Sequence, residues 1–264
     1  MRQFIFKRTC AVLALSLTLL ACGKQDPNTL AVGTIAGPET ELVYVAQTVA
    51  LEQYGLTIKI VEFSDYNLPN EALMDGTLDA NIYQHLPYLQ AASKAHGYHF
   101  DVIGKTFVYP TGLYSTQIKS LQTLPDHALI ALPNDPSNEA RALLLLQKAG
   151  LITLKSTQNA TIRDVASNPK KLRFKELDAA QLPRVLADVD AAVINTTFAI
   201  PAGLSPSHDA LFIENKDSPY ANLIVIRQDS DKKAQLTLLV KALNSKAVKD
   251  KAHELFGDAA IVAW

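Results

Sequence analysis

The pattern of apolar and polar positions switches between strand-like and helix-like stretches from residue 30 onward. Residues 30–36 form a near-continuous apolar run, which is typical of a buried parallel strand. Gly37-Pro38 interrupts the run, and apolar residues then recur at helical spacing as far as Gly55, with acidic residues in the favourable first turn. Residues 56–60 alternate as a second strand. This region therefore begins as strand, helix, strand.

The same alternation continues towards the C-terminus. Further strands are predicted at 79–83, 100–103, 107–109, 128–132, 172–177, 191–194 and 223–226. Further helices are predicted at 69–75, 87–96, 138–149, 236–243 and 246–256. Strands that alternate with helices favour an α/β fold with parallel sheets covered on both faces.

The pattern restarts after Gly112, which divides the chain into two blocks and predicts two lobes. We assign residues 30–112 and 205–264 to the first lobe and residues 113–204 to the second. Ligands of open α/β sheets bind beyond the carboxyl ends of the strands, so the expected site lies in the cleft between the lobes.

The N-terminus carries a targeting signal. Arg2, Lys7 and Arg8 precede a short apolar stretch, and this order predicts a secretory signal peptide over residues 1–21. The stretch is shorter than the roughly 20 residues that a membrane-spanning helix needs. Residues 19–23 (LLACG) resemble a bacterial lipobox, so we expect Cys22 to be lipidated, followed by a polar tether to residue 29. The alternative is a chance cysteine near an ordinary cleavage site. A lipidated Cys22 would anchor the protein in a membrane, facing the periplasm or the exterior.

Charge and cysteine content narrow the possible functions. The chain has 25 basic and 26 acidic residues, and this balance does not favour nucleic acid as a partner. Removal of residues 1–21 takes away three basic residues and no acidic ones, which leaves a net charge of −4. The two cysteines, Cys10 and Cys22, both precede the folded region, so thiol catalysis and a cysteine metal site are excluded there. His96 and His99 have no third ligand nearby, and no metal site is expected.

The first candidate functional residue is Arg141. It follows the strand-to-helix turn 133–136, and Ser137 is the expected N-cap of the helix. A cation near a helix N-terminus is unfavourable by roughly 0.3–1 kcal/mol, so Arg141 is expected to meet an anion. A guanidinium can bind a carboxylate or phosphate through two points. Pairing with Glu139 or another surface acid is an equally good explanation.

Ring side chains gather at predicted strand ends of the first lobe. Tyr83, His85 and Tyr88 lie around the end of one strand, and Tyr66 lies in an earlier strand-to-helix loop. Such rings can enclose an apolar or thioether group, because sulfur and aromatic rings attract each other by roughly 0.3–1.5 kcal/mol per contact. Each ring taken alone is better explained by ordinary packing.

Two asparagines occupy comparable positions. Asn195 follows the apolar residues 191–194, and Asn222 precedes the apolar residues 223–226. An amide can accept from an ammonium and donate to a carboxylate, which suits a zwitterionic ligand. Equally, Asn195 can be an N-cap and Asn222 a turn residue.

Several longer segments resemble the NlpA family of lipoproteins, and the likeness extends over residues 28–264. These segments are Asp65-Tyr66, Leu68 to Leu73, Asp79 to Leu89, Phe107 to Pro110, Asn134 to Arg141, Ala192 to Thr197, Ser218 to Tyr220 and Asn222 to Val225. The resemblance implies a two-lobed type II periplasmic-binding-protein fold that closes by hinge motion. It also implies an extracytoplasmic protein that binds methionine without a cofactor and delivers it to an ABC permease driven by a cytoplasmic ATPase.

The resemblance further implies a role for each candidate residue. Arg141 would hold the methionine carboxylate, Asn195 and Asn222 would hold the amino-acid head group, and the rings of Tyr66, Tyr83, His85 and Tyr88 would form the side-chain pocket. Tyr83 stands where the family pattern has Phe, and its hydroxyl would narrow or polarise that pocket.

Two other functions remain open at this point. The ligand could be another small apolar amino acid or a short peptide. More remotely, the protein could be an extracytoplasmic enzyme with His85 as general base and Tyr66 or Tyr83 as acid, although no activated nucleophile, paired carboxylates or metal set accompanies them.

Overall fold

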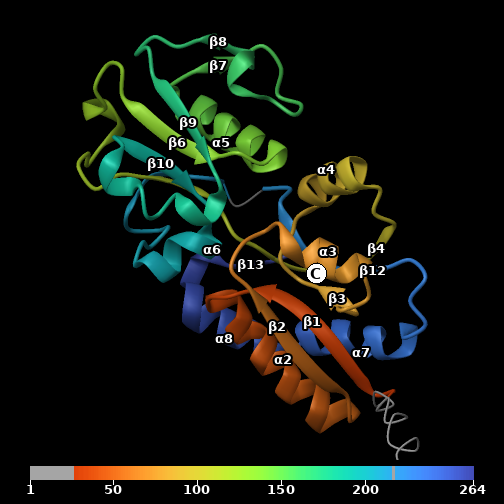
Figure 1. The fold of residues 1–264 in the computed structure, drawn as a ribbon. Helices are drawn as coiled ribbons and strands as arrows, with labels where there is room; N and C mark the ends of the chain where they lie inside the picture. The colour runs from red at the N-terminus through yellow and green to blue at the C-terminus, as the bar shows by residue number, and fades with distance from the viewer. Residues whose placement is uncertain (1–26, 216–217) are drawn as a thin grey trace, which may run out of the picture.

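The structure is a computed structural model that describes residues 27–215 and 218–264. The expected signal peptide over residues 1–21 and the lipidated Cys22 lie outside the described residues. Two α/β lobes, each built on its own sheet, lie one above the other (Figure 1). The two-lobed α/β fold expected from the sequence is confirmed. No helix in the described part of the chain is long and apolar enough to cross a membrane.

The sheet of the first lobe has six strands in the order β13-β4-β12-β3-β1-β2. Their bounds are β1 Thr29–Ile35, β2 Thr57–Phe63, β3 Ala80–Asn81, β4 Phe100–Val108, β12 Ala221–Arg227 and β13 Ile261–Val262. The helices of this lobe are α2 Pro38–Tyr54, α3 Leu68–Met74, α4 Leu86–His96, α7 Lys233–Leu243 and α8 Lys246–Phe256.

Helices cover both faces of this sheet. Alternate residues of a strand point to opposite faces, and β12 shows the two cores that result. Ile224 and Ile226 belong to the core formed with α2, α7 and α8, whereas Leu223 and Val225 pack in the core formed with α3 and α4.

The sheet of the second lobe has five strands in the order β11-β5-β10-β6-β9. Their bounds are β5 Gly112–Tyr114, β6 Leu129–Pro133, β9 Arg173–Leu177, β10 Ala191–Ile194 and β11 Ala210–Ile213, and a separate pair consists of β7 Thr153–Leu154 and β8 Val165–Ser167. The helices are α5 Pro136–Lys148 and α6 Thr196–Ala199. Short 3₁₀ helices complete the chain at Leu121–Thr123, Ile162–Asp164, Ala179–Gln181, Leu186–Asp188, Ile200–Ala202 and Gly257–Ala259.

The expectation of parallel sheets is wrong in part, because both sheets are mixed. β1, β2 and β3 are parallel, but β12 is antiparallel to both β3 and β4. In the second lobe, β5 is antiparallel to β10. Both β5 and β12 follow a crossing from the other lobe, so each enters its sheet from the cleft side and runs away from it. The sequence pattern indicates a strand but not the direction from which the chain enters it.

The residue limits of the two lobes stay a prediction, and the strand pairing suggests different limits. β11 pairs with β5 of the second sheet, although the predicted division placed residues 205–264 in the first lobe. We propose that the second lobe takes in residues 112–213 and that the chain returns to the first lobe after β11.

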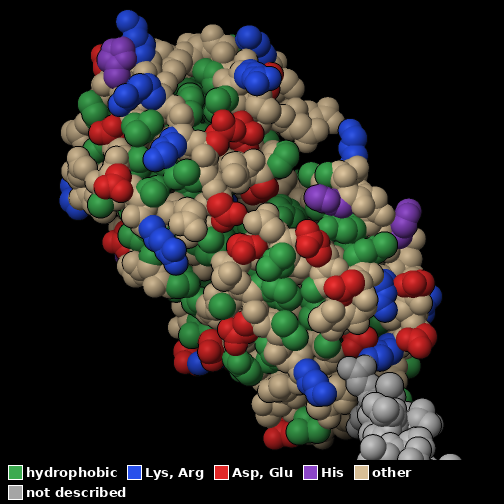
Figure 2. All heavy atoms as spheres, viewed as in Figure 1, with side chains coloured by type: hydrophobic (Ala, Val, Ile, Leu, Met, Phe, Trp, Pro, Cys, Tyr) green, Lys and Arg blue, Asp and Glu red, His purple; other side chains and the backbone are tan. Residues whose placement is uncertain are grey.

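Acidic and basic side chains are interspersed over both lobes on the face shown in Figure 2. This distribution agrees with the near-zero formal charge of the full sequence, −1. A continuous basic surface of the kind that binds a phosphate backbone is not present on this face.

Candidate functional site

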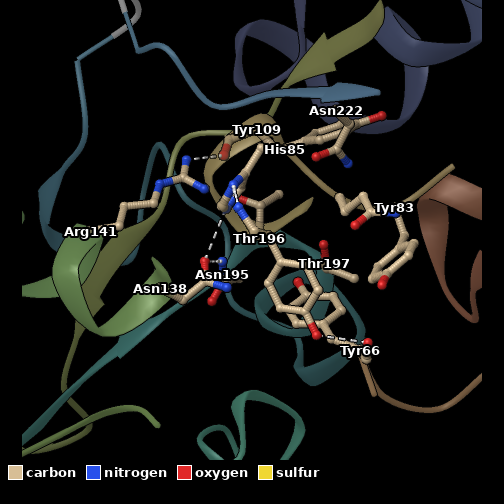
Figure 3. A pocket seen from close by; sticks show the side chains of 12 residues that line it. Tyr66, Tyr83, His85, Tyr109, Asn138, Arg141, Asn195, Thr196, Thr197 and Asn222 are labelled. Atoms are coloured by element: carbon tan, nitrogen blue, oxygen red, sulfur yellow. Dashed lines mark hydrogen bonds between the residues drawn. The ribbon is translucent and has the colours of Figure 1, made fainter. Parts of the chain in front are cut away.

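A cavity lies where strand ends of the two lobes meet (Figure 3). All seven residues singled out from the sequence line it: Tyr66, Tyr83, His85, Tyr88, Arg141, Asn195 and Asn222. Five further residues complete the lining: Gln84, Tyr109, Asn138, Thr196 and Thr197. The structure therefore brings the candidates together, and their roles toward a ligand remain proposals.

Strand direction explains why these residues meet. β3, β6 and β10 end at the cleft, and the residues that follow them lead directly into α4, α5 and α6. β12 runs the opposite way, so its first residues reach the same place. His85 and Asn222 accordingly form an isolated antiparallel bridge at the cleft.

Arg141 is buried, with an exposed fraction of 4%, and lies in a dense set of contacts. Its Nε donates to Glu214 at 3.1 Å, and its Nη2 donates both to Glu214 and, at 2.9 Å, to the carbonyl oxygen of Tyr109. Its Cζ atom lies 4.3 Å from the ring centroid of Tyr220, a cation–π contact. The suggested ion pair of Arg141 does form, but with the buried Glu214 rather than a surface acid. Glu139 is not the partner, because its carboxylate accepts from the backbone N–H of Ile162.

The pairing with Glu214 decides what Arg141 can still bind. Glu214 is 7% exposed and also accepts, at 3.3 Å, from the backbone N–H of Thr111. These bonds use Nε and Nη2 of Arg141 and balance its charge, so the pair can stay buried without a ligand. The two N–H groups on Nη1 are outside these bonds and can donate to a carboxylate in the cavity.

His85 is held as a neutral imidazole. As the N-cap of α4, its Nδ1 accepts from the backbone N–H of Tyr88 at 3.2 Å. Nε2 therefore carries the proton and donates to Asn138 Oδ1, 3.3 Å away. Burial, and then the nearby charge of Arg141, lower the pKa of His85 to about 3. A ring with both nitrogens engaged and this pKa is unsuited to act as a general base near neutral pH.

Asn138 fixes the second-lobe side of the cavity. Its Nδ2 donates to both oxygens of Asp135, at 3.1 and 2.9 Å, which turns Oδ1 toward His85 and Asn195. Asn195 Nδ2 donates to that Oδ1 at 2.9 Å. The N-cap of α5 is Asp135, which accepts from the backbone N–H of Asn138, so the expectation that Ser137 caps this helix is wrong. Pro136 at the first helical position places the cap one residue earlier.

Asn195 presents an unsatisfied acceptor to the cavity. It precedes α6 at the N-cap position, but its side chain makes no capping bond there. Its buried Oδ1 has no hydrogen-bond partner among the described residues, and the same holds for the hydroxyl of Tyr83. Buried polar atoms are rarely left without a partner, so both atoms indicate that something else completes the site.

The tyrosine rings form one cluster. The ring centroids of Tyr66, Tyr83 and Tyr88 are separated by 5.8 to 6.0 Å, and Tyr88 donates to the carbonyl oxygen of Tyr66 at 2.8 Å. Phe198, from the second lobe, lies 4.9 Å from Tyr66 and closes the cluster across the cleft. Burial raises the pKa of Tyr66 and of Tyr83 well above the usual range, so these phenols stay neutral.

Glu39 contacts two residues that line the cavity, and sequence reasoning missed it. It lies in the first turn of α2 and is 6% exposed. Thr197 Oγ1 donates to its Oε1 at 2.6 Å, and Asn222 Nδ2 lies 3.4 Å from its Oε2. Burial raises the pKa of the Glu39 carboxyl to about 7. The sequence pattern shows acidic residues in this turn but cannot tell that Glu39 faces the cleft while Glu41 faces solvent.

Asn138, Glu214, Tyr220 and Phe198 were missed as well. Asn138 and Tyr220 lie inside segments that carry the family resemblance, which is the one signal that could have indicated them. Asn222 is the second residue of β12 rather than a turn residue. Within residues 27–215 and 218–264, no group of three His, Cys, Asp or Glu side chains could hold a metal ion.

Comparisons with known proteins agree with this geometry. The chain is 49% identical over 269 residues to the D-methionine-binding lipoprotein MetQ of Salmonella typhi, covering 99% of each chain. An ABC transporter periplasmic substrate-binding protein from Coxiella burnetii has 61% identity and a TM-score of 0.86, over 89% of this chain and 100% of that one. A nutrient-binding protein from Burkholderia cenocepacia, solved bound to methionine, has 50% identity and a TM-score of 0.87 over the same shares. The profile of the NlpA lipoproteins matches residues 30–264. On these matches and this fold, the chain belongs to the NlpA lipoprotein family.

Proposed function

We propose that the protein is an extracytoplasmic binding lipoprotein that captures methionine between its lobes and delivers it to an ABC import permease. The observation that carries this proposal is the composition of the cavity. A buried guanidinium with a free donor edge lies on one side, and a cluster of tyrosine rings lies on the other. A free amino acid with an apolar side chain matches both sides.

The polar side of the cavity suits a zwitterion. Nη1 of Arg141 donates to the ligand carboxylate, and Oδ1 of Asn195 accepts from its ammonium. Asn222 contributes a second amide to the head group. The Arg141–Glu214 pair and the neutral His85 add little net charge, so a ligand whose own charges cancel is preferred over a purely anionic one.

The aromatic side suits a thioether. Sulfur attracts aromatic rings by roughly 0.3–1.5 kcal/mol per contact, and three tyrosines together can supply several such contacts. The Tyr83 hydroxyl, which has no partner in the described part of the chain, adds a polar atom to this surface. The proteins from Salmonella typhi and Burkholderia cenocepacia, which are named for or solved with methionine, support the same ligand.

The enzymatic alternative requires His85 as general base. Its ring accepts a hydrogen bond at Nδ1 and donates one at Nε2, and its pKa of about 3 leaves little proton affinity at neutral pH. A binding role without chemistry therefore fits the site better.

Ligand identification tests the proposal. The protein is purified without added ligand, denatured, and the released small molecules are identified by mass spectrometry. Unfolded and refolded protein is then titrated calorimetrically with L-methionine, D-methionine, leucine and a methionyl dipeptide. Release and tight binding of methionine support the proposal, whereas a preference for leucine or the dipeptide would assign the site to that ligand instead.

The anchor and the transport partners belong to the same proposal. Cys22 carries the lipid that holds the protein on a membrane, and the partners are an ABC permease and its ATPase. Incorporation of labelled palmitate into the wild type but not into Cys22→Ser tests the anchor. Methionine-dependent association with the permease–ATPase complex of the same organism tests the partners.

A further inference from the structure

A buried hydrogen bond joins the two lobes beside the ligand cavity. Glu39 at the start of α2 belongs to the first lobe, and Thr197 in α6 belongs to the second. The Thr197 hydroxyl donates to Glu39 Oε1 at 2.6 Å, between residues separated by 158 positions in the chain. Glu39 lines a second cavity, which shares Tyr109 and Asn222 with the first.

The backbone around this bond is also closely packed. Gly37, two residues before Glu39, has φ of 145°, which favours glycine, and a Cβ atom there would lie 3.3 Å from Pro201 and 3.7 Å from the carbonyl oxygen of Thr197. The N-terminus of α2 therefore lies directly against α6 and the turn after it. Closing the lobes brings these two elements together.

We propose that Glu39 is a positioning residue that couples ligand binding to lobe closure. One of its carboxylate oxygens accepts a hydrogen bond from Thr197 of the opposite lobe, and the other orients Asn222 toward the ligand. This inference rests on the proposed binding function. Asn222 lines the ligand cavity and Glu39 does not, so Glu39 acts through its neighbours rather than on the ligand.

A buried carboxyl group needs hydrogen-bond donors, and this need links the contact to the closed arrangement of the lobes. The hydrogen bonds to Glu39 from described residues come from Thr197 and Asn222. The titratable groups that face it are the phenols of Tyr66 and Tyr109, which are neutral and bring no positive charge. With the lobes apart, Glu39 would meet water instead. With the lobes closed, the Thr197 hydroxyl is needed to satisfy the carboxyl, so closure is favoured only when that bond forms.

A double-mutant cycle tests the coupling. Methionine affinity and dissociation rate are measured by calorimetry and stopped-flow fluorescence for the wild type, Thr197→Val, Glu39→Met and the double variant. Thr197→Val keeps the side-chain shape but removes the hydroxyl, and we expect about 10- to 100-fold weaker binding, mainly through faster dissociation. In the Glu39→Met background the same substitution should add less than about threefold, because the bond is already absent.

Three further variants make the result specific. Thr197→Ser retains the hydroxyl and should restore most of the affinity. Glu41→Gln removes an exposed carboxylate from the same turn, and Asn67→Ala removes an exposed bond between the lobes, 3.1 Å from Asn67 Nδ2 to Asp178. Both controls should change affinity by less than about twofold, because exposed pairs contribute little.

The outcomes separate this inference from the proposed function. Failure of the wild type to bind methionine would refute the function. Additive losses in the cycle would show that Thr197 acts on the ligand directly and would overturn the role of Glu39, as would unchanged affinity in Thr197→Val. X-ray scattering measures closure separately from affinity. At saturating methionine, Thr197→Val should have a larger radius of gyration than the wild type, and equal radii would also overturn the inference. If Glu39→Met does not fold, the Val and Ser variants at Thr197 suffice.

Discussion

Replacing Arg141 by Met separates ligand binding from folding stability. Met fills a similar volume but removes the donors to Glu214 and to the Tyr109 carbonyl oxygen. Glu214, 7% exposed, would keep only the Thr111 backbone N–H as a partner. Breaking a buried ion pair by removing one partner costs about 3–5 kcal/mol, because the remaining charge is uncompensated. We expect the free energy of unfolding of Arg141→Met to fall by that amount in urea titrations.

The same variant should also lose the ligand carboxylate. Removing a charged hydrogen-bond donor from a buried site weakens binding by at least about 2 kcal/mol, or roughly 30-fold in Kd. Calorimetric titration with methionine measures this loss at a temperature where the variant is folded.

A second substitution provides the control. Arg141→Met/Glu214→Gln removes the stranded charge while the Gln side-chain oxygen still accepts from Thr111, so most of the lost stability should return. Binding should not return, because no donor faces the carboxylate. Recovery of methionine affinity in the double variant, or a loss of less than threefold in the single one, would refute the reasoning and make Arg141 a structural ion-pair residue.

Three further predictions concern buried groups. Tyr83→Phe removes a hydroxyl that has no partner among the described residues, so the ligand-free variant should be as stable as the wild type or more stable by up to about 1 kcal/mol in urea, and a clear loss would contradict this. His85 has a pKa of about 3 in the folded protein against 6.5 when unfolded, so its contribution to stability is complete above pH 6.5 and declines as the pH falls toward 3. NMR titration of the ring should show no protonation at pH 5, and a midpoint near pH 6 would disprove the prediction. The Glu39 carboxyl has a pKa of about 7 in the folded protein against 4.5 when unfolded, so the wild type should lose stability relative to Glu39→Gln as the pH rises from 4.5 through 7. Urea denaturation at pH 5 and pH 8 measures the difference in free energy of unfolding between the two proteins, and an equal difference at both pH values would rule the prediction out.

Much of the fold and of the candidate site could be predicted from the sequence. Helical and alternating apolar spacing predicted most of the elements, because burial against a sheet imposes those periods on the chain. Polar and ring residues at strand ends, such as Tyr83 and Asn195, were candidates because strands of an α/β sheet end at one edge. All seven candidates line one cavity for this reason.

The tertiary structure alone decided which groups far apart in the sequence pair with each other. Glu39 meets Thr197 at a separation of 158 residues, and Arg141 meets Glu214 at 73. The spacing of apolar residues within one helix or strand does not encode such pairings. They depend on the direction in which β12 and β5 enter their sheets after the chain crosses between the lobes. Charge neutralisation of Arg141, the neutral state of His85 and the elevated pKa of Glu39 likewise follow from burial in the folded protein, which no local sequence pattern determines.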